Sequence, residues 1–189
     1  MQYLTKASQA FSVFNRNQKL DFVLRFIDSH SISSCLIVGA IPRRSGQDYQ
    51  NLIEVGILQN LEHVVFSGLE DDGGLWPNWV QADGTNLPFQ DKSFDLVFSN
   101  AVIEHVGEIE EQRQFVIEHN RVGNRFILTT PNRFFPIESH TRVLFRHMSG
   151  AWKDPAFTRL LSKSDLKDLL PPESKIRGKV LSPTFLAFN

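Results

Sequence analysis

The chain has 189 residues, enough for one domain with a substantial buried core. Its net charge of −1, with 22% charged and 41% hydrophobic residues, gives no basic field, so we expect no nucleic-acid partner. The single cysteine, Cys35, excludes an internal disulfide framework. No segment approaches the ~18 apolar residues of a membrane span, and the N-terminal residues lack the apolar core of a signal peptide. We therefore expect a cytoplasmic protein without a membrane span.

Predicted helices and strands alternate through the first half of the chain. Apolar residues at helical spacing predict a helix over residues 20–29, within a helical N-terminal extension over about residues 1–32. The apolar run 35–38, which ends at Gly39, predicts a buried parallel strand. We expect the next helix over 48–58, and three further strands over 63–67, 79–82 and 94–99.

The second half continues this alternation and ends in a strand pair. A helix is predicted over 108–120, with acidic residues in its first turn, and a fifth strand over 125–130. A short helix is expected over 161–170, with Ser164 as its N-cap and Pro171 as its stop. Two final strands are expected within 175–180 and 184–188. This order predicts an α/β fold in one domain, 1–189, with helices on both faces of the sheet.

Polar residues follow two of the predicted strands. Asp83 and Gly84 come directly after the third strand, and Ser99 and Asn100 end the fourth. In open α/β sheets, ligands bind in the crevice outside the carboxyl ends of the strands. We therefore expect these residues near a binding site.

The segment QADGTNLPFQDKSFDLVFSNAVIEHV, residues 81–106, closely resembles the motif region of class I S-adenosylmethionine-dependent methyltransferases. The later segment ILTTPNRFFPIESHT, residues 127–141, resembles the region after the fifth strand in the same family. The resemblance implies a Rossmann-like sheet of seven mostly parallel strands with an antiparallel C-terminal hairpin. It also implies S-adenosyl-L-methionine as the cofactor.

The resemblance assigns cofactor roles to residues at the ends of the first two strands. Gly39 and Ala40 occupy the place of the family's glycine-rich cofactor loop, where backbone approaches the ligand closely. An acidic residue after the second strand would accept hydrogen bonds from the ribose hydroxyls, with Glu70 as first choice and Asp71 as second. The alternatives are a plain strand-to-helix turn at Gly39 and a solvated acidic turn at Glu70.

The ends of the third and fourth strands are assigned in the same way. Asp83 would accept the adenine amino group, while Gly84 lets the backbone approach the base. Asp83 alternatively caps its own turn. Asn100 is expected beside the methionine carboxylate and the methyl group of the cofactor.

Two residues depart from the family pattern. Ile37 stands where an acidic residue is usual, and Ile41 where a second glycine is usual. A branched side chain at Ile41 would crowd the methionine part of the cofactor, and the lost carboxylate would remove a partner of its amino group. Two functions therefore stay open: a methyltransferase, or a non-catalytic methyltransferase-like binding module with a degraded cofactor loop.

Three residues are catalytic candidates on the acceptor side of the predicted cleft. His105 is a candidate general base after the fourth strand, and Glu138 with His140 could accept a proton beyond the fifth. Each of them could instead orient a loop.

No metal site is expected, because the chain lacks paired cysteines and lacks the two closely spaced histidines of a helical zinc site. We expect a small-molecule methyl acceptor, and its identity and the oligomeric state stay open.

Overall fold

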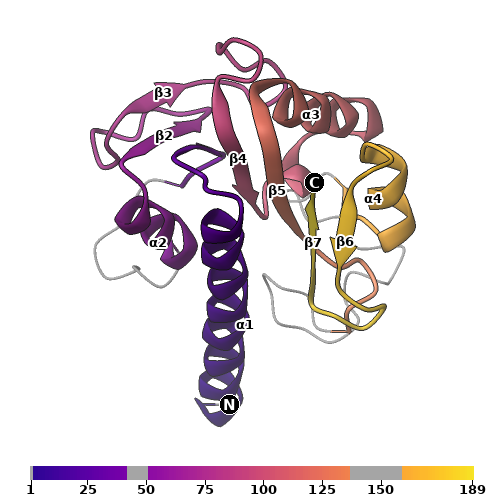
Figure 1. Ribbon diagram of the computed structural model, residues 1–189. Coiled ribbons are helices and arrows are strands. Elements are labelled where there is room, and N and C mark those ends of the chain that lie inside the picture. Colours follow the sequence, from indigo (N-terminus) through magenta and orange to yellow (C-terminus); the bar gives the residue numbers. More distant parts are fainter. Residues whose placement is uncertain (1, 42–50, 137–158) are drawn as a thin grey trace.

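The computed structural model describes residues 2–41, 51–136 and 159–189, with side chains from residue 12 onward. Seven strands form one sheet in the order β3-β2-β1-β4-β5-β7-β6 (Figure 1). Strands β1 to β5 run parallel, and β7 is antiparallel to both of its neighbours. This confirms the predicted Rossmann-like sheet with its antiparallel C-terminal pair. The strands are β1 (Ser34–Val38), β2 (His63–Gly68), β3 (Trp79–Gln81), β4 (Phe94–Asn100), β5 (Gly123–Pro131), β6 (Lys175–Arg177) and β7 (Thr184–Phe188).

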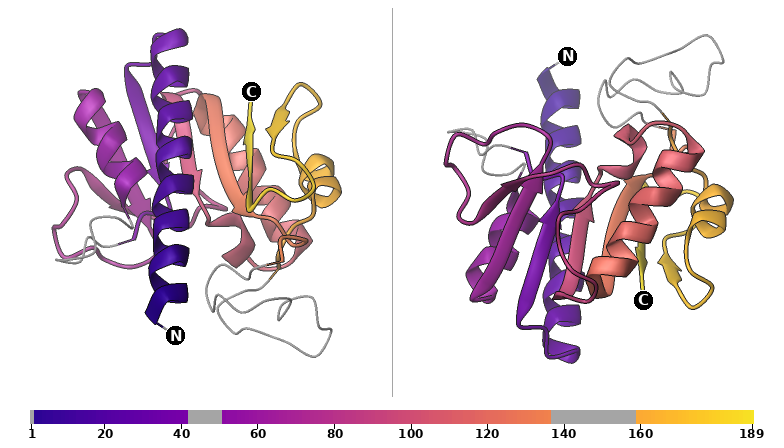
Figure 2. Two further views of the ribbon diagram at one scale, coloured as in Figure 1. Left: turned by 90° about the horizontal axis from the view of Figure 1, so that it is seen from below. Right: turned by 90° about the horizontal axis from the view of Figure 1, so that it is seen from above.

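Helices cover both faces of this sheet, as expected (Figure 2). On one face, α1 (Gln2–Ser29) and α2 (Leu52–Asn60) bury apolar residues against β1, β2 and β4. On the other face lie α3 (Ile109–Val122) and α4 (Lys163–Leu169), and the short 3₁₀ helix η1 (Ile103–His105) follows β4. Central strands covered on both sides explain why their sequences read as continuous apolar runs.

Side chains of each strand alternate between these two layers. Ile37 and its register partner Phe98 pack under α1 and α2, whereas Val38 packs on the α3 side. The strand order reverses between β1 and β4, which is where an open α/β sheet forms its crevice.

Some elements differ from the sequence predictions. Helix α1 begins at Gln2, so it extends through most of the predicted helical extension and beyond the 20–29 segment that apolar spacing indicated; no Gly or Pro interrupts residues 2–19. Helix α4 is capped by Ser162, not Ser164: Ser162 and Asp165 bond reciprocally to each other's backbone N–H at 3.1 and 2.9 Å. The first C-terminal strand is shorter than expected and ends at Arg177.

None of the helices in the described part of the chain is both long enough and apolar enough to cross a membrane.

Candidate functional site

A cavity of about 500 Å³ lies at the carboxyl ends of β1, β2 and β3. Three consecutive strand ends form one side of it, and η1 with the start of α3 forms the other. Its wall consists of residues 38–41, 68–70, 82–85, 102, 105–107, 111 and 115. The wall therefore includes Gly39, Ala40, Glu70, Asp83, Gly84 and His105, six of the nine residues singled out from the sequence.

The turn after β1 is held in a conformation that favours glycine. Gly39 has φ +74°, and a Cβ there would lie 2.6 Å from both methyl groups of Val102. The N–H groups of Gly39 and Ala40 donate to the Ser67 carbonyl oxygen at 2.8 and 3.0 Å, which ties the turn to β2. The turn is thus fixed by the fold itself, at the edge of the cavity.

The two departures from the family pattern have different structural consequences. Ile41 is 58% exposed and forms part of the wall, and its carbonyl oxygen accepts from Trp76 Nε1 at 2.9 Å. The cavity persists with this side chain in place. Ile37 is 1% exposed and belongs to the core under α1 and α2, so no carboxylate enters from that position.

The acidic loop after β2 separates its three carboxylates into different roles. Asp71 accepts from the Gly73 N–H at 3.1 Å. Asp72 is buried and accepts from the Gly74 and Trp76 N–H groups at 2.9 and 2.6 Å. Both therefore stabilise the turn, whereas Glu70 is exposed and lies in the cavity wall. Of these two ribose-binding candidates, Glu70 lies in the cavity wall and Asp71 does not, and the ribose contact itself stays a prediction.

The loop after β3 presents Asp83 in a defined orientation. Its Oδ1 accepts from the backbone N–H and the hydroxyl of Thr85, both at 2.8 Å, which is a turn of the kind that aspartate favours. Its other oxygen, Oδ2, takes no part in these bonds. Gly84 packs so closely that a Cβ would lie 2.5 Å from the Phe115 ring. The turn role and a ligand role for Asp83 are therefore compatible.

The remaining candidates do not lie in this wall. Asn100 ends β4, but its side chain is directed to the α1–α2 face, where Lys19 Nζ and Thr129 Oγ1 donate to Oδ1 at 2.9 and 2.8 Å. Its Nδ2 donates to Glu54 Oε1 at 3.1 Å. Its expected cofactor contact stays a prediction. Glu138 and His140 lie outside the described residues.

Burial dominates the electrostatics beside the cavity. Burial raises the pKa of Glu54, which is 7% exposed, and lowers the pKa of Lys19 to about 8. It also raises the pKa of the fully buried Glu104 to about 7, although the Thr130 hydroxyl donates to its carboxylate at 3.1 Å. Sequence reasoning did not single out Lys19 or Glu54. Lys19 is one of several charged residues in its helix and carries no distinct signal, whereas Glu54 is the charged residue of a largely apolar helical segment.

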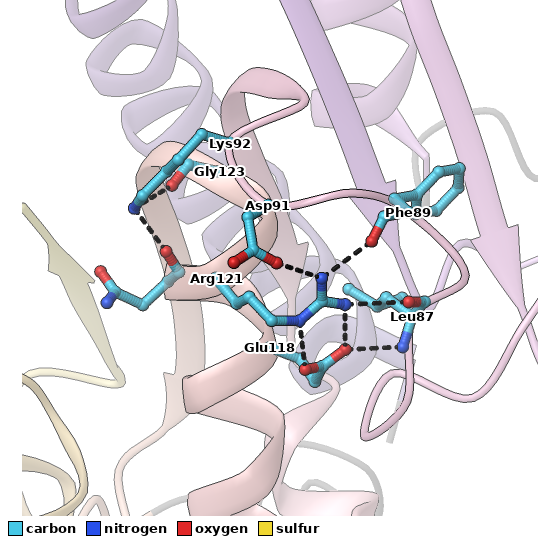
Figure 3. Close-up of polar contacts among 8 residues, drawn as sticks. Leu87, Phe89, Asp91, Lys92, Glu118, Arg121 and Gly123 are labelled. Carbon is cyan, nitrogen blue, oxygen red and sulfur yellow. Dashed lines mark hydrogen bonds and ion pairs between the residues drawn. The ribbon is translucent and has the colours of Figure 1, made fainter.

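A second polar feature anchors the loop that leaves the cavity wall (Figure 3). We call it the Arg121 hub: Arg121 and Glu118 of α3 with Leu87, Phe89 and Asp91 of the loop. The Arg121 guanidinium donates five hydrogen bonds of 2.7–2.9 Å. Three go to the Glu118 and Asp91 carboxylates, and two go to the Leu87 and Phe89 carbonyl oxygens. Glu118 also accepts from the Leu87 N–H at 2.8 Å. The hub fixes the β3–β4 loop on α3.

Lys92 continues this attachment at the end of α3. Its ammonium donates to the Asn120 and Gly123 carbonyl oxygens at 2.6 and 2.9 Å (Figure 3). A cation is favourable there because the last carbonyls of a helix carry partial negative charge.

Among the described residues, no group of three or more His, Cys, Asp or Glu side chains is arranged to hold a metal ion.

Comparisons with known proteins agree with this fold. Residues 56–125 match the family described as a methyltransferase domain. An uncharacterized methyltransferase of Mycobacterium sp. (strain JLS) is 31% identical over 81 residues, which is 43% of this chain and 32% of that protein. The chain therefore matches about a third of the length of this curated relative.

Solved structures show the same fold at low sequence identity. The YcgJ protein of Bacillus subtilis has a TM-score of 0.62 and 16% identity over 86% of this chain and 71% of its own. Magnesium protoporphyrin IX methyltransferase (ChlM) of Synechocystis PCC 6803, solved with bound SAH, has a TM-score of 0.58 and 14% identity over 92% and 82%. The PH0226 protein of Pyrococcus horikoshii OT3 has a TM-score of 0.58 and 18% identity over 92% and 88%. The match over residues 56–125, the partial match to the curated relative and the shared fold support the resemblance to class I S-adenosylmethionine-dependent methyltransferases.

Proposed function

We propose that this chain is a methyltransferase that binds S-adenosylmethionine in the cavity at the ends of β1, β2 and β3 and methylates a small molecule. The observation that carries the proposal is the cavity itself: about 500 Å³, with Glu70 and Asp83 in its wall beside the Gly39 turn. This volume lies within the range of small-molecule sites, roughly 300–1,000 Å³. A structurally similar methyltransferase, ChlM, was solved with SAH bound.

The proposed roles follow from the chemistry of the two carboxylates. Glu70 accepts hydrogen bonds from the ribose hydroxyls. Asp83 accepts a hydrogen bond from the adenine amino group through Oδ2, because Oδ1 already accepts two hydrogen bonds from Thr85. The Thr85 bonds keep the carboxylate oriented, so little side-chain freedom is lost when the base binds.

Methyl transfer makes modest demands on the protein. The sulfonium group supplies a good leaving group, so the chain contributes alignment and exclusion of water. His105 lies in the cavity wall and would serve as general base where the acceptor must lose a proton. We keep Glu138 and His140 as proposed acceptor-side residues.

The alternative function, a non-catalytic binding module, rested on Ile37 and Ile41. The cavity is present with the Ile41 side chain in its wall, which weakens this alternative.

Titration calorimetry with S-adenosylmethionine and S-adenosylhomocysteine tests the proposal. We expect saturable binding of both, weakened about tenfold or more by Asp83→Asn or Glu70→Gln. Asp71→Asn is the matched control, since Asp71 lies in the same loop but outside the cavity wall. Absence of heat with either ligand at millimolar concentration would refute the proposed function. Release of S-adenosylhomocysteine in the presence of candidate acceptors would then identify the acceptor.

A further inference from the structure

The cavity wall contains one side chain that is unexpected at its position. Ile41 stands where the methyltransferase family that the sequence resembles usually has a glycine, and its branched side chain is large enough to enter the space that a ligand needs. The side chain nevertheless forms part of the wall of an open cavity of about 500 Å³. The direction in which it lies therefore depends on what holds the backbone at this residue.

Hydrogen bonds fix the backbone on both sides of the Ile41 side chain. Before it, the N–H groups of Gly39 and Ala40 donate to the Ser67 carbonyl oxygen at 2.8 and 3.0 Å. After it, the Ile41 carbonyl oxygen accepts from Trp76 Nε1 at 2.9 Å. A β-branched side chain has few allowed rotamers, so a fixed backbone leaves it few directions. The bond from Trp76 is the one of these three that a side chain donates, so a substitution can remove it.

Trp76 is itself held firmly in place. It is buried, and its ring stacks on Phe66 of β2 with the ring centroids 4.3 Å apart and 14° between the planes. Its backbone N–H donates to Asp72 Oδ2 at 2.6 Å, and the buried Asp72 also accepts from the Gly74 N–H at 2.9 Å. The indole N–H therefore reaches Ile41 from a fixed place in the core.

This arrangement depends on the connection between β2 and β3. Parallel neighbouring strands are usually joined through a helix. Here residues 69–78 contain neither helix nor strand, and a loop joins the two strands (Figure 1). Within this loop Trp76 packs into the same core as residues of α1 and α2. A loop instead of a helix thus brings an indole N–H to the turn that follows β1.

We propose that Trp76 is a positioning residue, which holds Ile41 at the margin of the cavity and so keeps the cavity open for S-adenosylmethionine. This rests on the proposed function and deepens it: a chain with isoleucine at position 41 accepts the ligand because that residue is held. Trp76 is not among the described residues of the cavity wall, so it acts through Ile41. Without the Nε1–H donor, the peptide group after Ile41 is free to rotate, and the side chain can turn into the cavity.

A double-mutant cycle, measured by titration calorimetry with S-adenosylhomocysteine, tests the inference. Trp76→Phe keeps an aromatic ring on Phe66 and removes the donor to Ile41. We expect it to weaken binding about fivefold to tenfold, as the loss of one hydrogen bond does. Ile41→Ala removes the branched side chain and should alone change the affinity less than about threefold. In that background Trp76→Phe should change the affinity less than about twofold, because no bulky side chain is left to position.

Leu75→Ala is the matched control. Leu75 is the exposed neighbour of Trp76 in the same loop, and its truncation should leave the affinity unchanged. Equal weakening by Trp76→Phe in both backgrounds would show that Trp76 only stabilises the fold. This result, or wild-type affinity in Trp76→Phe, would overturn the inference and leave the proposed function standing.

Unfolding curves verify that Trp76→Phe is folded. If it is not, Ile41→Ala decides alone: binding about tenfold tighter than in the wild type would show that Ile41 obstructs the cavity, which overturns the inference, whereas nearly unchanged affinity supports it. A wild-type protein that binds neither S-adenosylmethionine nor S-adenosylhomocysteine would end the proposed function, and the inference with it.

Discussion

A second polar group, which we call the β4-end cluster, consists of Lys19 of α1, Glu54 of α2, Asn100 of β4 and Thr129 of β5. The Arg121 hub and the β4-end cluster are both built around a buried glutamate, yet their hydrogen bonding differs in completeness. Glu118 is 5% exposed and Glu54 is 7% exposed. In the hub, both Glu118 oxygens accept and all five Arg121 N–H groups are donated. In the cluster, Glu54 Oε2 has no partner among the described residues. Two similarly buried glutamates therefore differ in their hydrogen bonding. We call the hub a closed network, because both oxygens of its glutamate accept hydrogen bonds, and the cluster an open network, because one oxygen of its glutamate does not.

The pKa values follow this difference. Hydrogen bonds from Arg121 lead the causes that hold the pKa of Glu118 below its ordinary value, whereas burial raises the pKa of Glu54. A closed network contributes stability, because every charged group keeps a partner. An open network costs stability, because a buried polar atom is left without a partner. We conclude that the hub stabilises the fold, whereas the β4-end cluster leaves one carboxylate oxygen of Glu54 without a donor among the described residues.

The largest expected effect is the loss of the hub. Arg121→Ala leaves the Glu118 carboxylate buried without its cation, and we expect the free energy of unfolding to fall by about 3–5 kcal/mol in urea titrations. Arg121→Lys should recover part of this loss, because an ammonium cannot donate five hydrogen bonds.

Arg113→Ala is the matched control on the same helix. Its side chain is 42% exposed and pairs at 3.7 Å with Glu110, which is 77% exposed, so the change should cost less than about 1 kcal/mol. Equal losses for Arg121→Ala and Arg113→Ala would show that the hub does not fasten the fold.

The next effect is a pH dependence beside the open network. Glu104 is fully buried with a pKa raised from 4.5 to about 7. The folded state therefore binds a proton that the unfolded chain releases, and the free energy of unfolding should fall as pH rises from about 4.5 to about 7, by up to about 3 kcal/mol. Glu104→Gln should flatten this slope in urea titrations across the window. A slope as steep as that of the wild type would assign the effect to another group; Glu62→Gln, at an exposed residue between α2 and β2, is the control.

The next prediction compares double substitutions that replace the charged pair of each network by apolar residues. We expect the free energy of unfolding to change in opposite directions in the two regions. Lys19→Met with Glu54→Leu removes two opposite charges that each bond to Asn100, so we expect unfolding to cost the same or about 1 kcal/mol more than in the wild type. Asn100 keeps its bond from the Thr129 hydroxyl. Arg121→Met with Glu118→Leu instead leaves the Leu87 and Phe89 carbonyls without donors and should lose about 3 kcal/mol. Thermal unfolding of both double variants makes the comparison, and a loss in both would mean that the β4-end cluster also stabilises the fold.

The sequence predicted the sheet because parallel strands covered on both faces must be apolar throughout, as in 35–38 and 94–99. It also predicted that Gly39, Glu70 and Asp83 lie close together, since the topology brings consecutive strand ends to one edge, and all three line the cavity. Their roles toward a cofactor stay predictions. The bond between the Gly73 N–H and Asp71 depends on the loop backbone and could not be predicted from the sequence.

The contacts between distant segments could not be predicted in this way. Lys19 and Asn100 are 81 residues apart. Periodicity indicates the face on which each side chain lies, but not which residue of another element it meets. The N-cap of α4 was misplaced for a related reason: Ser162 and Ser164 are both suitable residues, and the reciprocal bond with Asp165 decides between them.

The smallest effect separates completeness from burial. Asp95, at the start of β4 and far from the cavity, accepts from the N–H and hydroxyl groups of Ser33 and Ser34 at 2.6–3.1 Å, and these bonds lower its pKa to about 2. Its contribution to stability is present above the ordinary value of 3.8 and is lost as pH falls toward about 2. Asp95→Asn should therefore lower the free energy of unfolding by about 1 kcal/mol at neutral pH, since solvent screens this partly exposed site, and the difference should vanish in acid. Exposed Asp21→Asn is the control. If Asp95→Asn costs stability as predicted, a complete set of partners stabilises a charge even near the surface; if it costs nothing, the contrast between hub and cluster holds for buried charges alone.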